Sequence, residues 1–174
     1  MVWTRGLALA GIVWCAGLLV ATTLPGGLRW PLAVVALSTA LPVVPGFVAV
    51  LLAGIRRTTG LQAETRAGQA KALWRLVRDT LPGWLLVASG LLFAGFWVVA
   101  VLTLTGSPGV AEEQAGTYVL NNNGETTVIS EAEYLSRRAR ESRLVAAVAG
   151  CFSVAVAVIS TALLRRKADK AVHP

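Results

Sequence analysis

Residues 144–164 read LVAAVAGCFSVAVAVISTALL, a run that contains no Asp, Glu, Lys, Arg or His. A bilayer core about 30 Å thick is crossed by about 20 helical residues, which is close to the length of this run. Three other uncharged runs of similar length occupy residues 7–24, 31–54 and 84–105. Within lipid, helices are the simplest way to satisfy the backbone of such segments. The sequence therefore predicts four transmembrane helices.

The overall composition agrees with a lipid environment. Of the 174 residues, 55% are hydrophobic and 14% are charged, and the mean hydropathy is +0.65. Soluble domains usually contain about 25% charged residues. We predict a single integral membrane domain over residues 1–174, with an all-α fold built as a four-helix transmembrane bundle. The high content of Ala, Val, Gly, Arg and Leu indicates a bacterial origin.

The basic residues predict the orientation in the membrane. With the N-terminus inside, eleven of the sixteen Lys and Arg residues fall on the cytoplasmic side and five on the other side. Cytoplasmic loops carry an excess of these residues, so both termini are expected in the cytoplasm of a multi-pass plasma-membrane protein. The net charge of +7 then reflects orientation and contact with anionic lipid, and not a nucleic-acid partner.

The second run contains the stretch STALPVVPGF at residues 38–47. Pro42 and Pro45 each remove a backbone donor, and Gly46 loosens the same region, so we expect a kink near the middle of the bilayer. Ser38 and Thr39 are placed to satisfy the freed carbonyl groups. The alternative interpretation is a broken helix that forms a transport site.

Small side chains recur every four residues along the fourth run. Ala149, Ser153, Ala157 and Thr161 lie on one helical face, where they would let another helix backbone approach closely. Matching small residues lie in the third run, at Gly90 and Ala94, and in the first, at Gly11 and Cys15. Packing within the bundle is the simpler expectation, and packing against another protein is the alternative.

The segment between the second and third runs, residues 55–83, has the pattern of a basic amphipathic helix. Its apolar positions are Ala70, Leu73, Trp74, Val77 and Leu81, and a separate stripe carries Lys71, Arg75 and Arg78. We expect this cytoplasmic helix to lie on the anionic inner leaflet with the basic stripe facing lipid. A docking site for a cytoplasmic partner is the alternative.

The segment between the third and fourth runs, residues 106–143, predicts a small folded module outside the membrane. Asn123–Gly124 is a strong signal for a two-residue β-turn, which would pair Leu120 with Thr127 in a two-stranded hairpin. Ser130 and Glu133 form a capping-box pattern, and Ile129 with Tyr134 forms a hydrophobic staple. A helix is therefore expected to start at Glu131 and to continue into the fourth span.

This module is the predicted partner-binding surface, because a hairpin on a rigid helix presents strand edges and side chains. The candidate residues are Tyr118, Leu120, Asn122, Asn123, Glu125, Thr127, Ile129 and Tyr134.

Catalytic, metal and cofactor sites are not expected. The chain has one histidine, His173, and two cysteines, Cys15 and Cys151, which lie in separate apolar runs. These ligands are too few and too scattered for a zinc site, and no nucleophile–base arrangement is recognisable. No acidic residue lies in any of the four runs, which counts against a proton-coupled transporter.

The sequence thus favours a non-enzymatic membrane protein that acts as an accessory, regulatory or immunity-type subunit. Its expected partners are membrane lipids and another membrane protein or a second copy of this chain. The alternative is a small oligomeric transporter or channel that uses the proline-containing second span.

Overall fold

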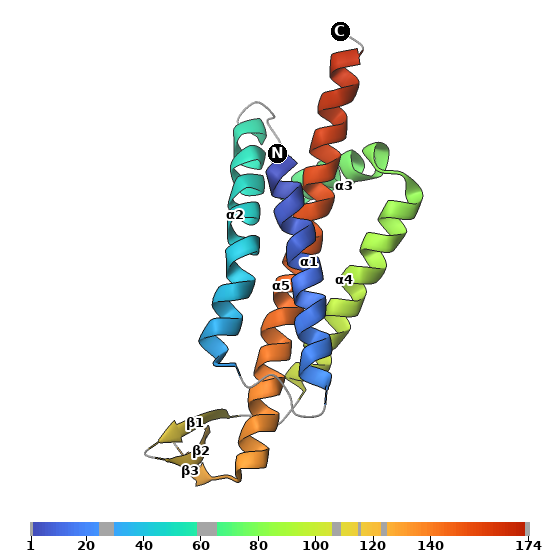
Figure 1. The fold of residues 1–174 in the computed structure, drawn as a ribbon. Helices are drawn as coiled ribbons and strands as arrows, with labels where there is room; N and C mark the ends of the chain where they lie inside the picture. Colours follow the sequence, from blue (N-terminus) through green and yellow to red (C-terminus); the bar gives the residue numbers. More distant parts are fainter. Residues whose placement is uncertain are drawn as a thin grey trace.

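The computed structural model describes residues 2–24, 30–58, 66–105, 109–114, 116–122 and 125–172. Five helices and three strands follow one another along the chain (Figure 1). In chain order they are α1 (Val2–Thr23), α2 (Leu32–Thr58), α3 (Arg66–Thr80), α4 (Gly83–Leu104), β1 (Val110–Gln114), β2 (Thr117–Asn122), β3 (Glu125–Val128) and α5 (Glu131–Val172).

Four of these helices, α1, α2, α4 and α5, are long and apolar enough to cross a membrane, in agreement with the four apolar helices expected from the sequence. The longest is α5, with 42 residues, and the other three spans pack against it (Figure 1). The chain begins α1 and ends α5 at the same end of the bundle, here called the terminal end. The three strands lie at the opposite end, here called the sheet end.

The interface between α1 and α5 is an antiparallel seam of small side chains. Ala8 packs with Val156 and Ala157, and Cys15 lies in one buried cluster with Cys151. A Cβ atom on Gly11 would lie 2.8 Å from the Ser153 hydroxyl oxygen, so the two backbones approach closely because position 11 has no side chain. Ser153 and Ala157 of the small-residue stripe therefore lie against α1 of the same chain.

An aromatic ring joins α4 to α5. The ring of Phe96 fills the space beside Gly150, where an added Cβ atom would lie only 2.5 Å from two ring carbons. Phe96 and Ala100 are the buried residues of α4. The expected contact through Gly90 and Ala94 is wrong, because Gly90 has no neighbouring atom within 4 Å of an added Cβ and Ala94 is exposed. The aromatic ring, and not a pair of small residues, sets this interface.

Both prolines of α2 lie inside a helix that continues from Leu32 to Thr58. A proline frees the carbonyl four residues before it, so the freed groups are those of Ser38 and Leu41. The Ser38 and Thr39 hydroxyls donate instead to the carbonyl of Val35, at 3.0 and 2.9 Å, so their expected role is corrected. Gly46 faces α5, where an added Cβ atom would lie 3.1 Å from Val156.

Helix α3 crosses the terminal end of the bundle (Figure 1) and is held there by two apolar residues. Val77 and Leu81, each 7% exposed, pack with Ala162 of α5. Trp74, from the same predicted apolar face, remains 60% exposed. Of the predicted apolar face, Val77 and Leu81 therefore pack within the chain, whereas Trp74 stays exposed.

Candidate functional site: the sheet at the end of the bundle

The segment before α5 forms a three-stranded antiparallel sheet with the order β1-β2-β3. The β2–β3 register pairs Val119 with Val128 and Leu120 with Thr127, as the sequence predicts. The pairing of Asn122 with Glu125 leaves two residues between these strands, and that predicted Asn123–Gly124 turn lies outside the described residues. Strand β1 adds a third strand to the expected two-stranded hairpin, and the chain is otherwise helical, as predicted.

Strand β1 was missed because its sequence, VAEEQ, contains one β-branched residue. Two glycines with positive φ mark it: Gly109, at 112°, precedes the strand and Gly116, at 80°, follows it. The pairing of Gln114 with Thr117 leaves a two-residue loop that ends in glycine, as does the loop between β2 and β3. Two successive two-residue loops that each end in glycine are the sequence signal that could have identified β1. A third strand also gives the hairpin support that an isolated two-stranded sheet lacks.

Two tyrosines join the sheet to α5. The rings of Tyr118 in β2 and Tyr134 in α5 stack with centroids 4.6 Å apart. The guanidinium of Arg138 lies 5.7 Å from the centroid of Tyr134, and its Nε donates to the Tyr134 hydroxyl at 3.3 Å. The predicted packing partner of Tyr134 was Ile129, but the aromatic partner in the structure is Tyr118. This stack fixes the position of the sheet relative to the helix.

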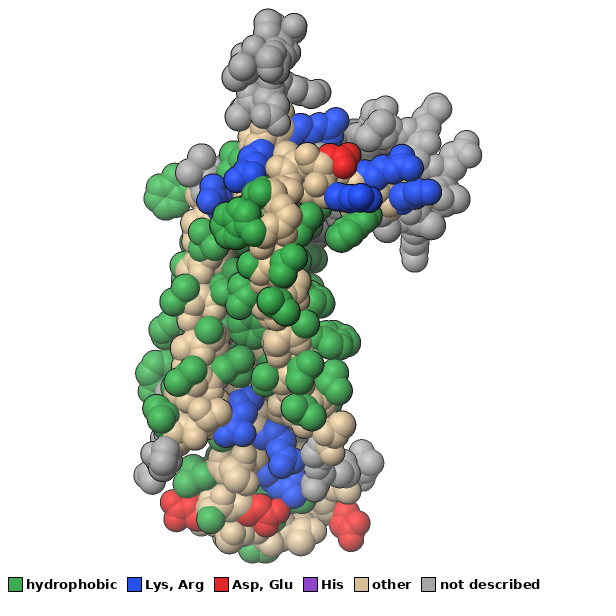
Figure 2. All heavy atoms as spheres, turned by 90° about the vertical axis from the view of Figure 1, so that its right-hand side faces the viewer, with side chains coloured by type: hydrophobic (Ala, Val, Ile, Leu, Met, Phe, Trp, Pro, Cys, Tyr) green, Lys and Arg blue, Asp and Glu red, His purple; other side chains and the backbone are tan. Residues whose placement is uncertain are grey.

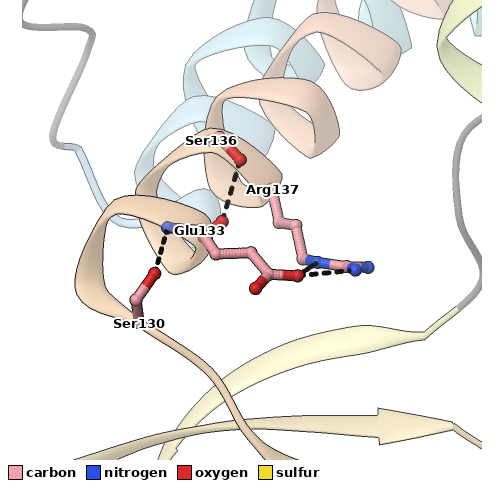
Figure 3. Close-up of polar contacts among 4 residues, drawn as sticks. All are labelled: Ser130, Glu133, Ser136 and Arg137. Atoms are coloured by element: carbon pink, nitrogen blue, oxygen red, sulfur yellow. Dashed lines mark hydrogen bonds and ion pairs between the residues drawn. The ribbon is translucent and has the colours of Figure 1, made fainter.

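The start of α5 is capped by Ser130 (Figure 3). The Ser130 hydroxyl accepts a hydrogen bond from the Glu133 backbone N–H at 3.2 Å, which is one half of the predicted capping box. The Glu133 carboxylate instead accepts hydrogen bonds from Arg137 Nε and Nη2, at 3.2 and 3.0 Å. The helix therefore begins at Glu131, as the sequence predicts, with an ion pair in its first turns.

The predicted partner-binding residues do not form one equally accessible surface. Tyr118, Leu120, Ile129 and Tyr134 are half-buried, and Asn123 lies outside the described residues. Asn122, Glu125 and Thr127 are exposed. Side chains that alternate along a strand place Tyr118, Leu120, Thr127 and Ile129 on one face, and this is the face that carries the stack with α5.

The most accessible part of the sheet is β3. All four of its residues are exposed, and Val128 is 71% exposed. The Ile129 N–H donates to the Tyr118 carbonyl at 2.9 Å, and donors alternate along a strand, so Thr127 and Glu125 also face β2. The N–H and C=O groups of Thr126 and Val128 therefore point away from the sheet. Strand β3 presents an open edge in which Thr126, Thr127 and Val128 are β-branched.

Charges are distributed differently at the sheet and along the bundle. Residues 110–128 contain Glu112, Glu113 and Glu125 and no Lys, Arg or His. Figure 2 shows hydrophobic side chains over the middle of the visible face, basic side chains toward both ends, and acidic side chains beyond the basic ones at the sheet end. The basic residues nearest the sheet are in α5, at Arg137, Arg138, Arg140 and Arg143. The sheet itself is a negatively charged tip.

At the terminal end, the predicted lipid-facing residues Lys71, Arg75 and Arg78 of α3 are exposed. Tryptophans at the ends of the spans are exposed as well: Trp3 by 85%, Trp30 by 46% and Trp84 by 68%. Tryptophan favours the interface between membrane and water, so these side chains are consistent with a bilayer around the four spans.

Among the described residues, no group of three or more His, Cys, Asp and Glu side chains is placed to hold a metal ion. Cys15 and Cys151 are buried free thiols. Comparisons of the chain with protein-family models, with curated proteins and with solved structures find no significant match. Four helices that are long and apolar enough to cross a membrane, together with a small three-stranded sheet, are compatible with a multi-pass membrane protein.

Proposed function

We propose that this protein is a non-enzymatic accessory, regulatory or immunity-type subunit of the bacterial plasma membrane that binds another membrane protein. The observation that carries the proposal is the open edge of β3, whose four residues are all exposed, on a sheet joined to α5 by the Tyr118–Tyr134 stack. An extended segment of a partner can add to such an edge through main-chain hydrogen bonds, and side chains then supply specificity. In this proposal both termini are cytoplasmic and the sheet faces the outside.

The charge of the sheet suggests the character of that segment. Glu125 belongs to β3 itself, and Glu112 and Glu113 lie on β1 without a basic residue in the sheet. A partner segment with Lys or Arg residues would be attracted to this tip and oriented on it. The β-branched side chains of β3 favour an equally β-branched partner strand.

The edge can be tested without removing any side chain that holds the sheet to α5. Val128→Pro removes an outward-facing N–H, and proline is tolerated on an edge strand where the N–H faces solvent. Val128→Thr is the matched control, because it keeps both the N–H and the β-branched shape. A photocrosslinker at Thr126 should give a defined adduct in cells, which Val128→Pro abolishes and Val128→Thr retains.

Two results would contradict the proposal. One is the absence of any adduct from Thr126 together with a monomeric protein after mild detergent extraction and chemical crosslinking. The other is an adduct that is equally strong in the Val128→Pro variant, because main-chain pairing at this edge would then be unnecessary.

Transport through α2 has less support. Pro42 lies 3.7 Å from the position of a Cβ atom on Gly11, and Gly46 faces Val156, so this region contacts α1 and α5. These contacts favour a packing role for the Pro42–Gly46 segment. Flux through reconstituted liposomes that is lost when Pro42 and Pro45 are replaced by Ala would reverse this preference.

A further inference from the structure

The spans α1 and α4 flank α5 on two sides and leave a groove between them. Arg5, Leu9 and Ile12 of α1 line one wall, Leu85 and Ser89 of α4 line the other, and Thr161 of α5 belongs to the floor. The volume of this open groove is about 160 Å³. The Ser89 hydroxyl donates to Leu86 O and the Thr161 hydroxyl donates to Ala157 O, so both hydroxyl groups are satisfied within their own helices. Apart from Arg5, the surface that the groove offers to a ligand is therefore apolar.

The shape of this groove limits what can occupy it. A helix with its side chains is about 10 Å across, and a groove of about 160 Å³ is too small to admit it. Water gains little from a cavity whose polar groups are already bonded. A single hydrocarbon chain is narrow and apolar, and the lipid that surrounds the spans supplies such chains. The groove therefore fits a lipid acyl chain.

Arg5 determines which lipid fits. It is exposed, and no carboxylate among the described residues forms an ion pair with it. The antiparallel seam, with Ala8 beside Ala157, places Arg5 near Thr161, one turn before Arg165 at the end of the uncharged run. From that depth an arginine side chain reaches the headgroup region. A phosphate there would meet the Arg5 guanidinium at the mouth of an apolar groove.

The length of the groove also agrees with the depth of one leaflet of the bilayer. Ile12 is seven residues beyond Arg5, so the groove follows α1 for about 10 Å. One leaflet of a bilayer core is about 15 Å deep, half of the roughly 30 Å total. An acyl chain that starts beneath a phosphate at Arg5 would follow the groove through most of one leaflet.

We propose that the groove between α1 and α4 is a binding site for one chain of an anionic phospholipid whose phosphate is held by Arg5. The proposal is independent of the partner-binding function, since it concerns the opposite end of the molecule. It also differs from general attraction of lipid to the exposed basic side chains of α3, Lys71, Arg75 and Arg78, none of which lines this groove. A lipid chain in this site would fill the groove between α1 and α4.

The test uses the full-length protein in phosphatidylcholine vesicles with a trace of spin-labelled phosphatidylglycerol or spin-labelled phosphatidylcholine of the same chain length. The fraction of immobilised label gives the preference for the anionic lipid. Arg5→Gln should lower this preference about fivefold, the loss expected for one basic residue at an anionic surface. Arg5→Lys should keep most of it, and added inorganic phosphate should not compete if the whole lipid is the ligand.

A second variant tests the groove itself. Ser89→Phe fills the space between α1 and α4 and should release the immobilised anionic lipid although Arg5 is intact. The matched control is Lys71→Gln, an exposed basic residue of α3 at the same end that does not line the groove, which should lower the preference less than Arg5→Gln does. The proposal is overturned if Arg5→Gln and Ser89→Phe have no effect, or if Lys71→Gln lowers the preference as much as Arg5→Gln does.

Discussion

Arg143 of α5 binds the last turn of α1 through Thr22, which lies 121 positions away in the chain. Its Nε donates to the Thr22 hydroxyl at 3.3 Å, and its Nη2 donates to the Thr22 carbonyl. The carbonyl groups of the last turn of a helix have no partner within the helix and carry partial negative charge, so a guanidinium there is favourable. Arg143 thus closes the sheet end of the α1–α5 seam.

We therefore expect Arg143→Ala to lower the free energy of unfolding by about 1.5–3 kcal/mol, the usual range for hydrogen bonds to a charged group. Arg143→Lys should recover only part of this, because an ammonium group does not reproduce the two-pronged geometry. Denaturation in mixed detergent micelles measures both changes. Arg140→Ala, an exposed neighbour on the same helix, is the control and should change stability by less than about 0.5 kcal/mol. Equal effects of the two alanine variants would show that the Thr22 contact contributes nothing specific.

The ring of Phe96 against Gly150 predicts a strong effect from a single methyl group. Gly150→Ala places a Cβ atom 2.5 Å from the ring, and the ring cannot bend away as a flexible side chain would. Overpacking of this kind costs about 1–3 kcal/mol, and α4 should separate from α5 first because Phe96 and Ala100 are its buried residues.

The neighbouring Gly95 provides a matched control, because an alanine there meets no atom within 4 Å. Gly95→Ala should be neutral, and the double variant Gly150→Ala with Phe96→Leu should regain part of the lost stability. Protease sensitivity of the connection between α3 and α4 reports the separation of α4. If Gly150→Ala is as stable as Gly95→Ala, the ring does not set this interface.

The spans and the start of α5 were predictable because their signals are local. An uncharged run of about 20 residues, or Ser130 three residues before Glu133, has the same physical meaning wherever it occurs. Contacts between helices depend on which faces meet, and that information is not local. The choice of Phe96 over Gly90 follows from the placement of α4 against α5. Strand β1 was missed because VAEEQ has little intrinsic preference for a strand and is stabilised by its neighbour β2.

The raised pKa of Tyr118 predicts that docking of the sheet on α5 depends on pH. Burial against α5, together with the negative charges of Glu131 and Glu113, raises the pKa of its phenol above the ordinary value of about 10. A pKa that is raised in the folded state stabilises the fold fully below the unfolded value, and this stabilisation is lost as the pH rises through the folded value. Docking of the sheet on α5 should therefore weaken only above about pH 10.

The chain has two tyrosines, so Tyr134→Phe leaves Tyr118 as the only phenol and preserves an aromatic ring for the stack. Ultraviolet titration of this variant should give a midpoint above that of free tyrosine. Replacing Glu131 by Gln in the same background should shift the midpoint down. A midpoint at the value of free tyrosine would mean that the ring of Tyr118 is not held against α5.

The orientation of the bundle can be tested at two exposed residues on opposite ends. Asn122 lies in the sheet and Lys71 lies in α3. Because Cys15 is 0% and Cys151 is 8% exposed, native thiols should give little background. With the termini in the cytoplasm, a membrane-impermeant maleimide should label Asn122→Cys in intact cells and Lys71→Cys only after permeabilisation. The opposite pattern would place the sheet in the cytoplasm, and the proposed partner of β3 would then have to be sought on that side of the membrane.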